Sequence, residues 1–168
     1  IWVANALPTP AILRVSQGGG EVWMDAVDGR SMLLPNDLCF GPDGMLYISS
    51  GERQKFQPAQ DLNQNLGKIV RLTDGGMVPS DNPFYDQGRV KSQIWSYGHR
   101  NPLGIAFDAN GRLWNQEMGP EGGDELNLVK KAANYGYPKV SNGRNYGAAT
   151  DDLPDHAPGD GFEAPKVF

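Results

Sequence analysis

The chain has 168 residues, of which 39% are hydrophobic and 21% are charged, and this length suits one packed domain of average size. The formal net charge of -5 argues against nucleic acid as a partner, because clustered lysine and arginine side chains bind phosphate backbones. No apolar stretch approaches the roughly 18 residues needed to cross a bilayer, so we expect no membrane span.

Short apolar runs separated by turn residues predict β-strands along the whole chain. In chain order, strands are expected at residues 1–6, 11–16, 21–27, 36–42, 45–51, 67–73, 92–98, 102–108, 112–118, 125–131 and 164–168. Turns and long loops divide this series into three strands, then four, then four. The single cysteine, Cys39, falls in one of these strands and is expected to be a buried small hydrophobe, not a nucleophile.

One hairpin pattern occurs twice, as "FGPDGMLY" from Phe40 and "FDANGRLW" from Phe107. Asp-Gly and Asn-Gly between apolar runs are the strongest short-range signal for a β-hairpin. Four-stranded units repeated in series are typical of β-propeller blades. We therefore predict an all-β fold, a partial β-propeller of about three blades over residues 1–168. A β-sandwich with a similar number of strands is the alternative.

A polar stretch, "SYGHRNPLG", joins the last strand of one expected blade to the first strand of the next. Its Arg100 and Asn101 offer a cationic fork beside an amide, which suits a carboxylate-rich or quinone-like ligand. The neighbouring His99 belongs to the residue type that titrates near neutral pH. Alternatively, Arg100 and Asn101 only hydrogen-bond to carbonyl groups at the end of a blade.

A second stretch, "NQEMGPEGGDELNL", places several carboxylates around a glycine-rich turn: Glu117, Glu121, Asp124 and Glu125. Dense oxygen ligands suit calcium, and the backbone carbonyls of Gly119 and Pro120 are additional candidates. The alternative is an acidic turn that is simply solvated.

Five stretches together resemble the soluble aldose sugar dehydrogenases that use pyrroloquinoline quinone: "SSGERQKFQPAQDLNQNLGKIVRLTDGG", "SDNPF", "IWSYGHRNPLGIAFD", "EMGPEGGDELNLVKKAANYGYP" and "FEAPKVF". The resemblance covers about residues 49–168. Members of that family are six-bladed propellers, usually exported to the periplasm, that oxidise the C1 hydroxyl of aldoses to lactones. The resemblance implies that Arg100 and Asn101 contact the quinone or the sugar, and that Gly119 and Pro120 donate carbonyls to the calcium that holds the quinone. It also implies a second, structural calcium site at Asp124, Glu125 and Tyr135.

The family's histidine general base falls at or near Leu33, and leucine cannot accept a proton. Cationic residues that the family supplies from later blades have no counterpart in the sequence either. The resemblance therefore implies a site that is only partly encoded. It leaves the electron acceptor and the particular sugar unspecified.

Residues 1–48 instead resemble the gluconolactonase and senescence-marker family, whose members hydrolyse lactones with a divalent metal, and Asn36 would then be a metal-facing residue. The two resemblances meet at the "GPDG" hairpin, which suggests a chimera or a misjoined fragment. Three functions stay open: quinone-dependent sugar oxidation, metal-dependent lactone hydrolysis, and a non-catalytic half-propeller. In the third case two copies pair through open blade edges as a homodimer.

Overall fold

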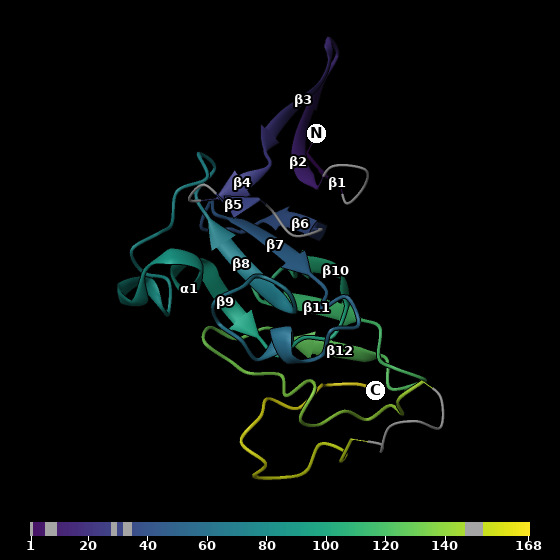
Figure 1. Ribbon diagram of the computed structural model, residues 1–168. Coiled ribbons are helices and arrows are strands. Elements are labelled where there is room, and N and C mark those ends of the chain that lie inside the picture. Colours follow the sequence, from purple (N-terminus) through teal and green to yellow (C-terminus); the bar gives the residue numbers. More distant parts are fainter. Residues whose placement is uncertain (1, 6–9, 28–29, 32–34, 147–152) are drawn as a thin grey trace.

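Three antiparallel sheets of three or four strands follow one another in the computed structural model, which describes residues 2–5, 10–27, 30–31, 35–146 and 153–168 (Figure 1). The first sheet is β1 (Trp2–Asn5), β2 (Ala11–Ser16) and β3 (Gly19–Met24). The second is β6 (Pro35–Phe40), β7 (Leu46–Ser50), β8 (Lys68–Leu72) and β9 (Ile94–Tyr97). The third is β10 (Pro102–Phe107), β11 (Leu113–Glu117) and β12 (Glu125–Leu128). Meandering sheets stacked in series are the arrangement of propeller blades, not of a sandwich.

The remaining elements are short. They are β4 (Ala26–Val27), β5 (Arg30–Ser31), the 3-10 helices η1 (Gln57–Ala59) and η2 (Tyr85–Gln87), and the helix α1 (Arg89–Gln93). Of these, β4 lies within the strand expected at 21–27, and the others were not predicted. The strand expected at 21–27 is broken after Met24, and the first two residues of the strand expected at 92–98 belong to α1. The strand expected at 164–168 is also wrong, since the segment makes only an isolated bridge between Val167 and Leu126.

The repeated hairpin is confirmed in both copies. Gly41 and Met45 are joined by a backbone hydrogen bond of 2.9 Å across the first turn, and Asp108 and Arg112 by one of 3.0 Å across the second. Gly44 and Gly111 have φ angles of +74° and +73°, a left-handed conformation that favours glycine. The same local chemistry therefore builds the turn between the first two strands of two successive blades.

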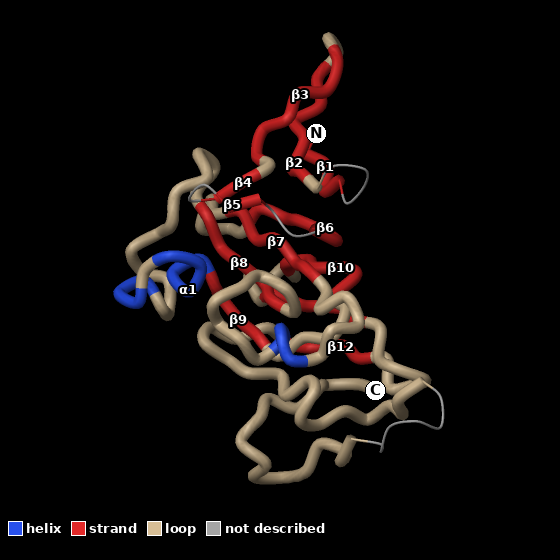
Figure 2. The backbone as a smooth tube through the Cα atoms, viewed as in Figure 1, coloured by secondary structure: helices blue, strands red, loops and turns tan. Residues whose placement is uncertain are grey.

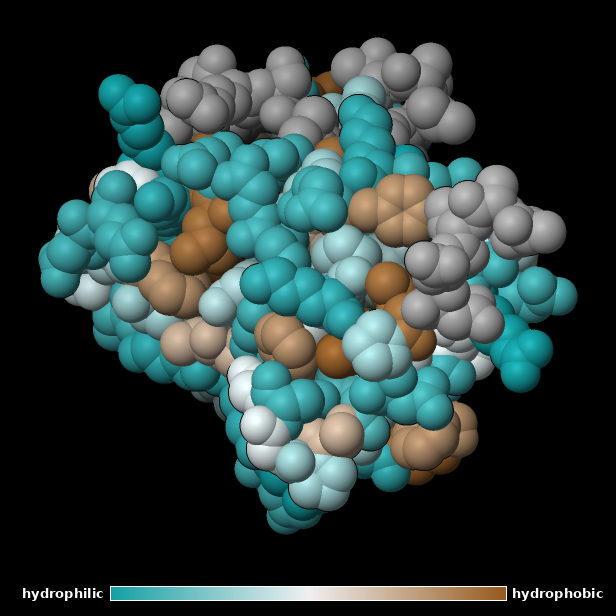
Figure 3. Space-filling view, turned by 60° about the horizontal axis from the view of Figure 1, so that its bottom comes forward, coloured by the Kyte–Doolittle hydropathy of each residue, from teal (hydrophilic) through white to brown (hydrophobic). Residues whose placement is uncertain are grey.

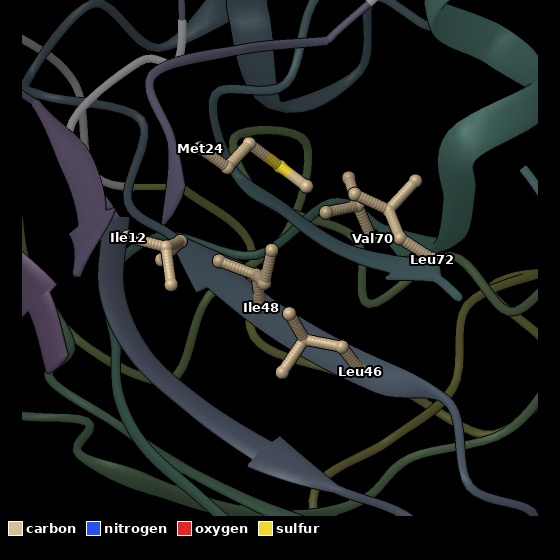
Figure 4. Close-up of a cluster of buried hydrophobic side chains, with 6 residues drawn as sticks. All are labelled: Ile12, Met24, Leu46, Ile48, Val70 and Leu72. Atoms are coloured by element: carbon tan, nitrogen blue, oxygen red, sulfur yellow. The ribbon is translucent and has the colours of Figure 1, made fainter. Parts of the chain in front are cut away.

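Both faces of the middle sheet are buried, one against each neighbouring sheet. Figure 4 shows the cluster on the face toward the first sheet, where side chains of β7 and β8 meet residues of β2 and β3: Ile12, Met24, Leu46, Ile48, Val70 and Leu72. Alternate residues of the same strands, Tyr47 and Ile69, pack on the third sheet with Ile105, Leu113 and Val129. This alternation explains why β7 and β8 are fully buried along their length.

The loops lie mostly at one end of this stack. Figure 2 shows strands through the upper and middle part of the molecule and mainly loop below β12. The face brought forward in Figure 3 is largely hydrophilic, with hydrophobic residues in separate patches. In the described part of the chain, no helix is long and apolar enough to cross a membrane.

Cys39 is half-buried, and burial raises the pKa of its thiol to about 12, which keeps it protonated.

Candidate active site

The turn after β9 places His99, Arg100 and Asn101 between two sheets. It begins at Gly98, whose φ angle is +75° and where an added Cβ would lie 2.1 Å from the Asn134 side-chain oxygen. Only glycine fits such a contact. The turn then pairs with the chain after β7, where the Glu52 amide donates to the Arg100 carbonyl at 2.8 Å.

Arg100 is 5% exposed, and its guanidinium is aimed at the acidic turn after β11. Its Nη1 donates to the Met118 carbonyl at 2.9 Å and also to the Gly119 carbonyl. These contacts match the alternative reading, in which Arg100 satisfies blade-end carbonyls. They do not use the whole side chain, because the buried Nε has no hydrogen-bond partner among the described residues. A buried donor without a partner is costly, and an anionic or carbonyl oxygen would satisfy it.

Arg100 lines two adjoining pockets of about 210 and 250 Å³. They share Glu52 and Gln54, the first also has Phe56, Pro120 and Tyr137 in its wall, and the second has Asn101 and Met118. The structure therefore brings Arg100 together with Pro120 in the first pocket and with Asn101 in the second. It adds Glu52, Gln54 and Phe56 from the loop after β7, a polar loop expected to carry function but with no residue named for the site.

That loop is held by Glu52, a carboxylate only 2% exposed. Its two oxygens accept hydrogen bonds from the backbone amides of Gln54 at 2.8 Å and Phe56 at 2.6 Å. The loop includes left-handed φ angles of +61° at Arg53 and +57° at Gln54. Non-glycine residues in this conformation are uncommon and cluster at functional sites. Sequence patterns carry no signal for such a conformation.

His99 is fully buried and does not face the pockets. Its Nε2 lies 2.9 Å from the Ser96 hydroxyl, its Nδ1 lies 3.1 Å from Glu117 Oε2, and its ring stacks on Tyr135. Burial by itself raises the pKa of Glu117, but His99 and the Asn115 amide outweigh it and lower that pKa overall. Glu117 also accepts a hydrogen bond from the Arg100 backbone amide, so this buried polar cluster holds the turn that carries Arg100.

The acidic turn divides into buried and exposed members. Glu117 and Glu125 face each other across β11 and β12 and are buried, whereas Glu121 and Asp124 are exposed. Burial, followed by repulsion from Glu117, raises the pKa of Glu125 to about 8. One carboxyl of this pair is therefore protonated at neutral pH.

This protonated carboxyl predicts a pH-dependent stability. The folded chain holds a proton on Glu125 that the unfolded chain releases near its ordinary pKa of 4.5. Stability therefore falls as pH rises from about 4.5 to about 8, by at most about 1.4 kcal/mol per pH unit. Glu125→Gln, whose amide resembles the protonated acid, should flatten this slope in urea titrations performed with a calcium chelator. Equal slopes in the two proteins would contradict the assignment.

The residues implied for calcium binding have other partners in this structure. Asp124 Oδ1 accepts from the Gly119 amide at 3.0 Å, and the Tyr135 hydroxyl donates to the Leu128 carbonyl at 2.7 Å. The Gly119 carbonyl accepts from Arg100, so calcium and the guanidinium compete for that oxygen. Within the described ranges, no three His, Cys, Asp or Glu side chains are grouped closely enough to hold a metal ion. Calcium binding at these positions stays a prediction.

Asn36, the other residue implied as metal-facing, lies on β6 against this site. Its carbonyl oxygen accepts from Arg53 Nη2 at 2.6 Å, and its amide donates to Asn101 at 3.0 Å. A guanidinium at that oxygen is an unfavourable neighbour for a metal cation. Leu33, which stands where the family's base is expected, lies outside the described residues.

The glucose/sorbosone dehydrogenase family model matches residues 29–168. This match begins before residue 49 and includes both Asn36 and the first hairpin. The separate origin predicted for residues 1–48 is not tested by it and stays a prediction.

Individual relatives agree with the family match. The aldose sugar dehydrogenase YliI of Escherichia coli is 47% identical over 110 residues, which are 65% of this chain and 30% of the relative. Quinoprotein glucose dehydrogenase B of Acinetobacter calcoaceticus is 38% identical over 123 residues, covering 62% of this chain and 25% of the relative.

Solved structures extend the likeness to nearly the whole chain. The apo-form of the soluble aldose sugar dehydrogenase from Escherichia coli superposes with a TM-score of 0.75 at 33% identity, over 98% of this chain and 51% of that one. The PQQ-bound aldose sugar dehydrogenase from Streptomyces coelicolor gives a TM-score of 0.69 at 29% identity, over 96% and 46%. The chain thus spans about half the length of these structures, and its fold is a partial β-propeller.

Proposed function

The chain belongs to the glucose/sorbosone dehydrogenase family, and from this membership we propose that it carries part of the site of a sugar dehydrogenase that uses pyrroloquinoline quinone. The proposed reaction is oxidation of an aldose at its C1 hydroxyl to a lactone. The observation that supports it most directly is the buried Arg100, whose Nε has no partner among the described residues and which lines pockets beside Asn101 and Pro120.

In this proposal each residue of the site has a separate task. Arg100 and Asn101 bind the oxygen atoms of the quinone or sugar, and the carbonyls of Gly119 and Pro120 hold calcium. Asp124, Glu125 and Tyr135 belong to the second calcium site. When bound, the quinone would supply a two-electron acceptor and calcium would polarise it. For calcium to bind, Arg100 would first have to release the Gly119 carbonyl, because two cations repel each other at one oxygen.

We expect the chain to bind the quinone but to oxidise sugar slowly or not at all. A general base contributes about 10²- to 10⁴-fold to such reactions, and leucine at position 33 supplies none. The cationic residues that the family resemblance expects to bind the quinone from later blades have no counterpart in this sequence. Export to the periplasm, implied by the family resemblance, is part of the same proposal.

Titration of pyrroloquinoline quinone by calorimetry, with calcium and with a chelator, tests the proposal. We expect calcium-dependent binding, together with weak or no aldose oxidation when an artificial electron acceptor is supplied. Absence of binding in both buffers would overturn it. Rapid turnover would support the quinone site but contradict the claim about Leu33.

Self-association is a second candidate function. The third sheet exposes Leu103 at 45% and Leu126 at 38%, apolar side chains that a second copy would cover. Solution mass by light scattering should then correspond to a homodimer, and a monomer would exclude it.

Lactone hydrolysis depends on the metal role of Asn36, which the contact with Arg53 disfavours. A hydrolysis assay with divalent metal and no quinone tests that alternative.

A further inference from the structure

Three side chains from three separate segments form a hydrogen-bonded chain that ends at the pocket. Arg53 Nη2 donates to Asn36 Oδ1 at 2.6 Å, and Asn36 Nδ2 donates to Asn101 Oδ1 at 3.0 Å. The same Nδ2 also donates to the Pro102 carbonyl at 2.9 Å. Arg53 and Asn101 both line the pocket of about 250 Å³.

The two partners of the Asn36 side chain determine which of its groups donates and which accepts in this hydrogen-bonded series. A guanidinium can only donate, so the group of Asn36 that faces Arg53 must be its oxygen. The Pro102 carbonyl can only accept, so the group that faces it must be the NH₂. These two partners fix the orientation of the Asn36 amide independently of any assignment of its oxygen and nitrogen. Asn36 therefore presents a donor to Asn101.

Asn101 must then present its oxygen to Asn36, and its NH₂ becomes the end available to a ligand. Its side chain is closely confined, because an added Cβ at Gly51 would lie 2.4 Å from Asn101 Oδ1. Its backbone carbonyl is also held, by the Met118 amide at 3.0 Å. The turn that carries Arg53 is held by the Glu52 carboxylate, which accepts hydrogen bonds from the backbone amides of Gln54 and Phe56.

We propose that Asn36 and Arg53 are positioning residues that fix the Asn101 carboxamide with its NH₂ toward the pocket. The site then selects a ligand oxygen that accepts hydrogen bonds, such as a quinone carbonyl or a carboxylate, at this position. The inference rests on the proposed function, in which Asn101 contacts the quinone. It also gives Asn36 a role that needs no metal.

Asn36→Asp is the decisive variant. The new carboxylate still accepts from Arg53 but cannot donate, so Asn101 must turn its NH₂ toward it and its oxygen toward the pocket. We expect quinone binding in calcium buffer to weaken about 10-fold. The reason is that one hydrogen bond is lost and the Asn101 oxygen then faces a ligand oxygen that also only accepts. Arg53→Lys keeps a donor at the end of the chain and should change the affinity less than about 3-fold. Asn110→Asp, an exposed Asn-to-Asp change at a distant turn, is the matched control for charge.

A second readout does not depend on the quinone. In side-chain amide NMR of the ligand-free chain, the NH₂ protons of Asn101 should exchange rapidly with water in the unmodified protein and slowly in Asn36→Asp. If this switch is seen but the unmodified protein binds no quinone, the proposed function fails and the positioning role stands. If the switch is absent, or if Asn36→Asp binds quinone as tightly as the unmodified protein, the positioning role is overturned.

Discussion

Replacing Arg100 with methionine is expected to weaken calcium-dependent quinone binding by about 10- to 100-fold. Methionine fills much of the same volume, so the packing under the pocket changes little. It removes the charged donors, and hydrogen bonds to charged groups contribute roughly 1.5–3 kcal/mol. The dissociation constant of pyrroloquinoline quinone in calcium buffer, measured by calorimetry, checks this.

Two further variants separate charge, geometry and general destabilisation. Arg100→Lys keeps the positive charge but loses the planar fork, and we expect an intermediate loss. Arg112→Met removes an arginine whose ion pair with Asp108 is largely exposed, so the affinity should stay within about 2-fold. An Arg100→Met protein that folds and binds as tightly as the Arg112→Met protein would show that Arg100 only caps blade carbonyls.

The repeated hairpin was predictable because all of its causes are local. Phe40 and Phe107 each precede a turn in which a glycine adopts a left-handed conformation, and the strands alternate in the period that a sheet requires. The first turn of helix in α1 carries no such signal. Its five residues, "RVKSQ", are too few for a periodic pattern, and they follow Gly88, whose φ angle of +63° is not part of a helix.

The site was predictable in its residue types but not in its contacts. Arg100 and Asn101 are adjacent in sequence and line one pocket, and Arg100 lines the adjoining pocket with Pro120. The contact between Asn36 and Asn101, in contrast, joins residues of two blades that are 65 positions apart. Burial was the other unpredictable quantity. Glu117 and Glu121 look alike in an acidic turn, yet the register of β11 against β12 places only Glu117 inside the sheet, opposite Glu125.

That difference in burial leads to the second large effect, in which Glu117→Ala lowers the free energy of unfolding by about 3–5 kcal/mol. The alanine leaves His99 Nδ1 and Asn115 Nδ2 buried without their common acceptor at 3.1 Å. Because small domains are stable by only about 5–15 kcal/mol, urea unfolding should reveal the change clearly.

The size of the effect depends on the acceptor oxygen, so Glu117→Gln is the informative comparison. Glutamine retains one oxygen for His99 and should cost only about 1–2 kcal/mol. Glu121→Ala changes the same residue type in an exposed position of the same turn and should stay within about 0.5 kcal/mol of the unmodified chain. If Glu117→Ala and Glu121→Ala unfold at the same urea concentration, the contact between His99 and Glu117 does not stabilise the turn that carries Arg100. The Arg100 guanidinium would then be held by the Met118 and Gly119 carbonyls alone.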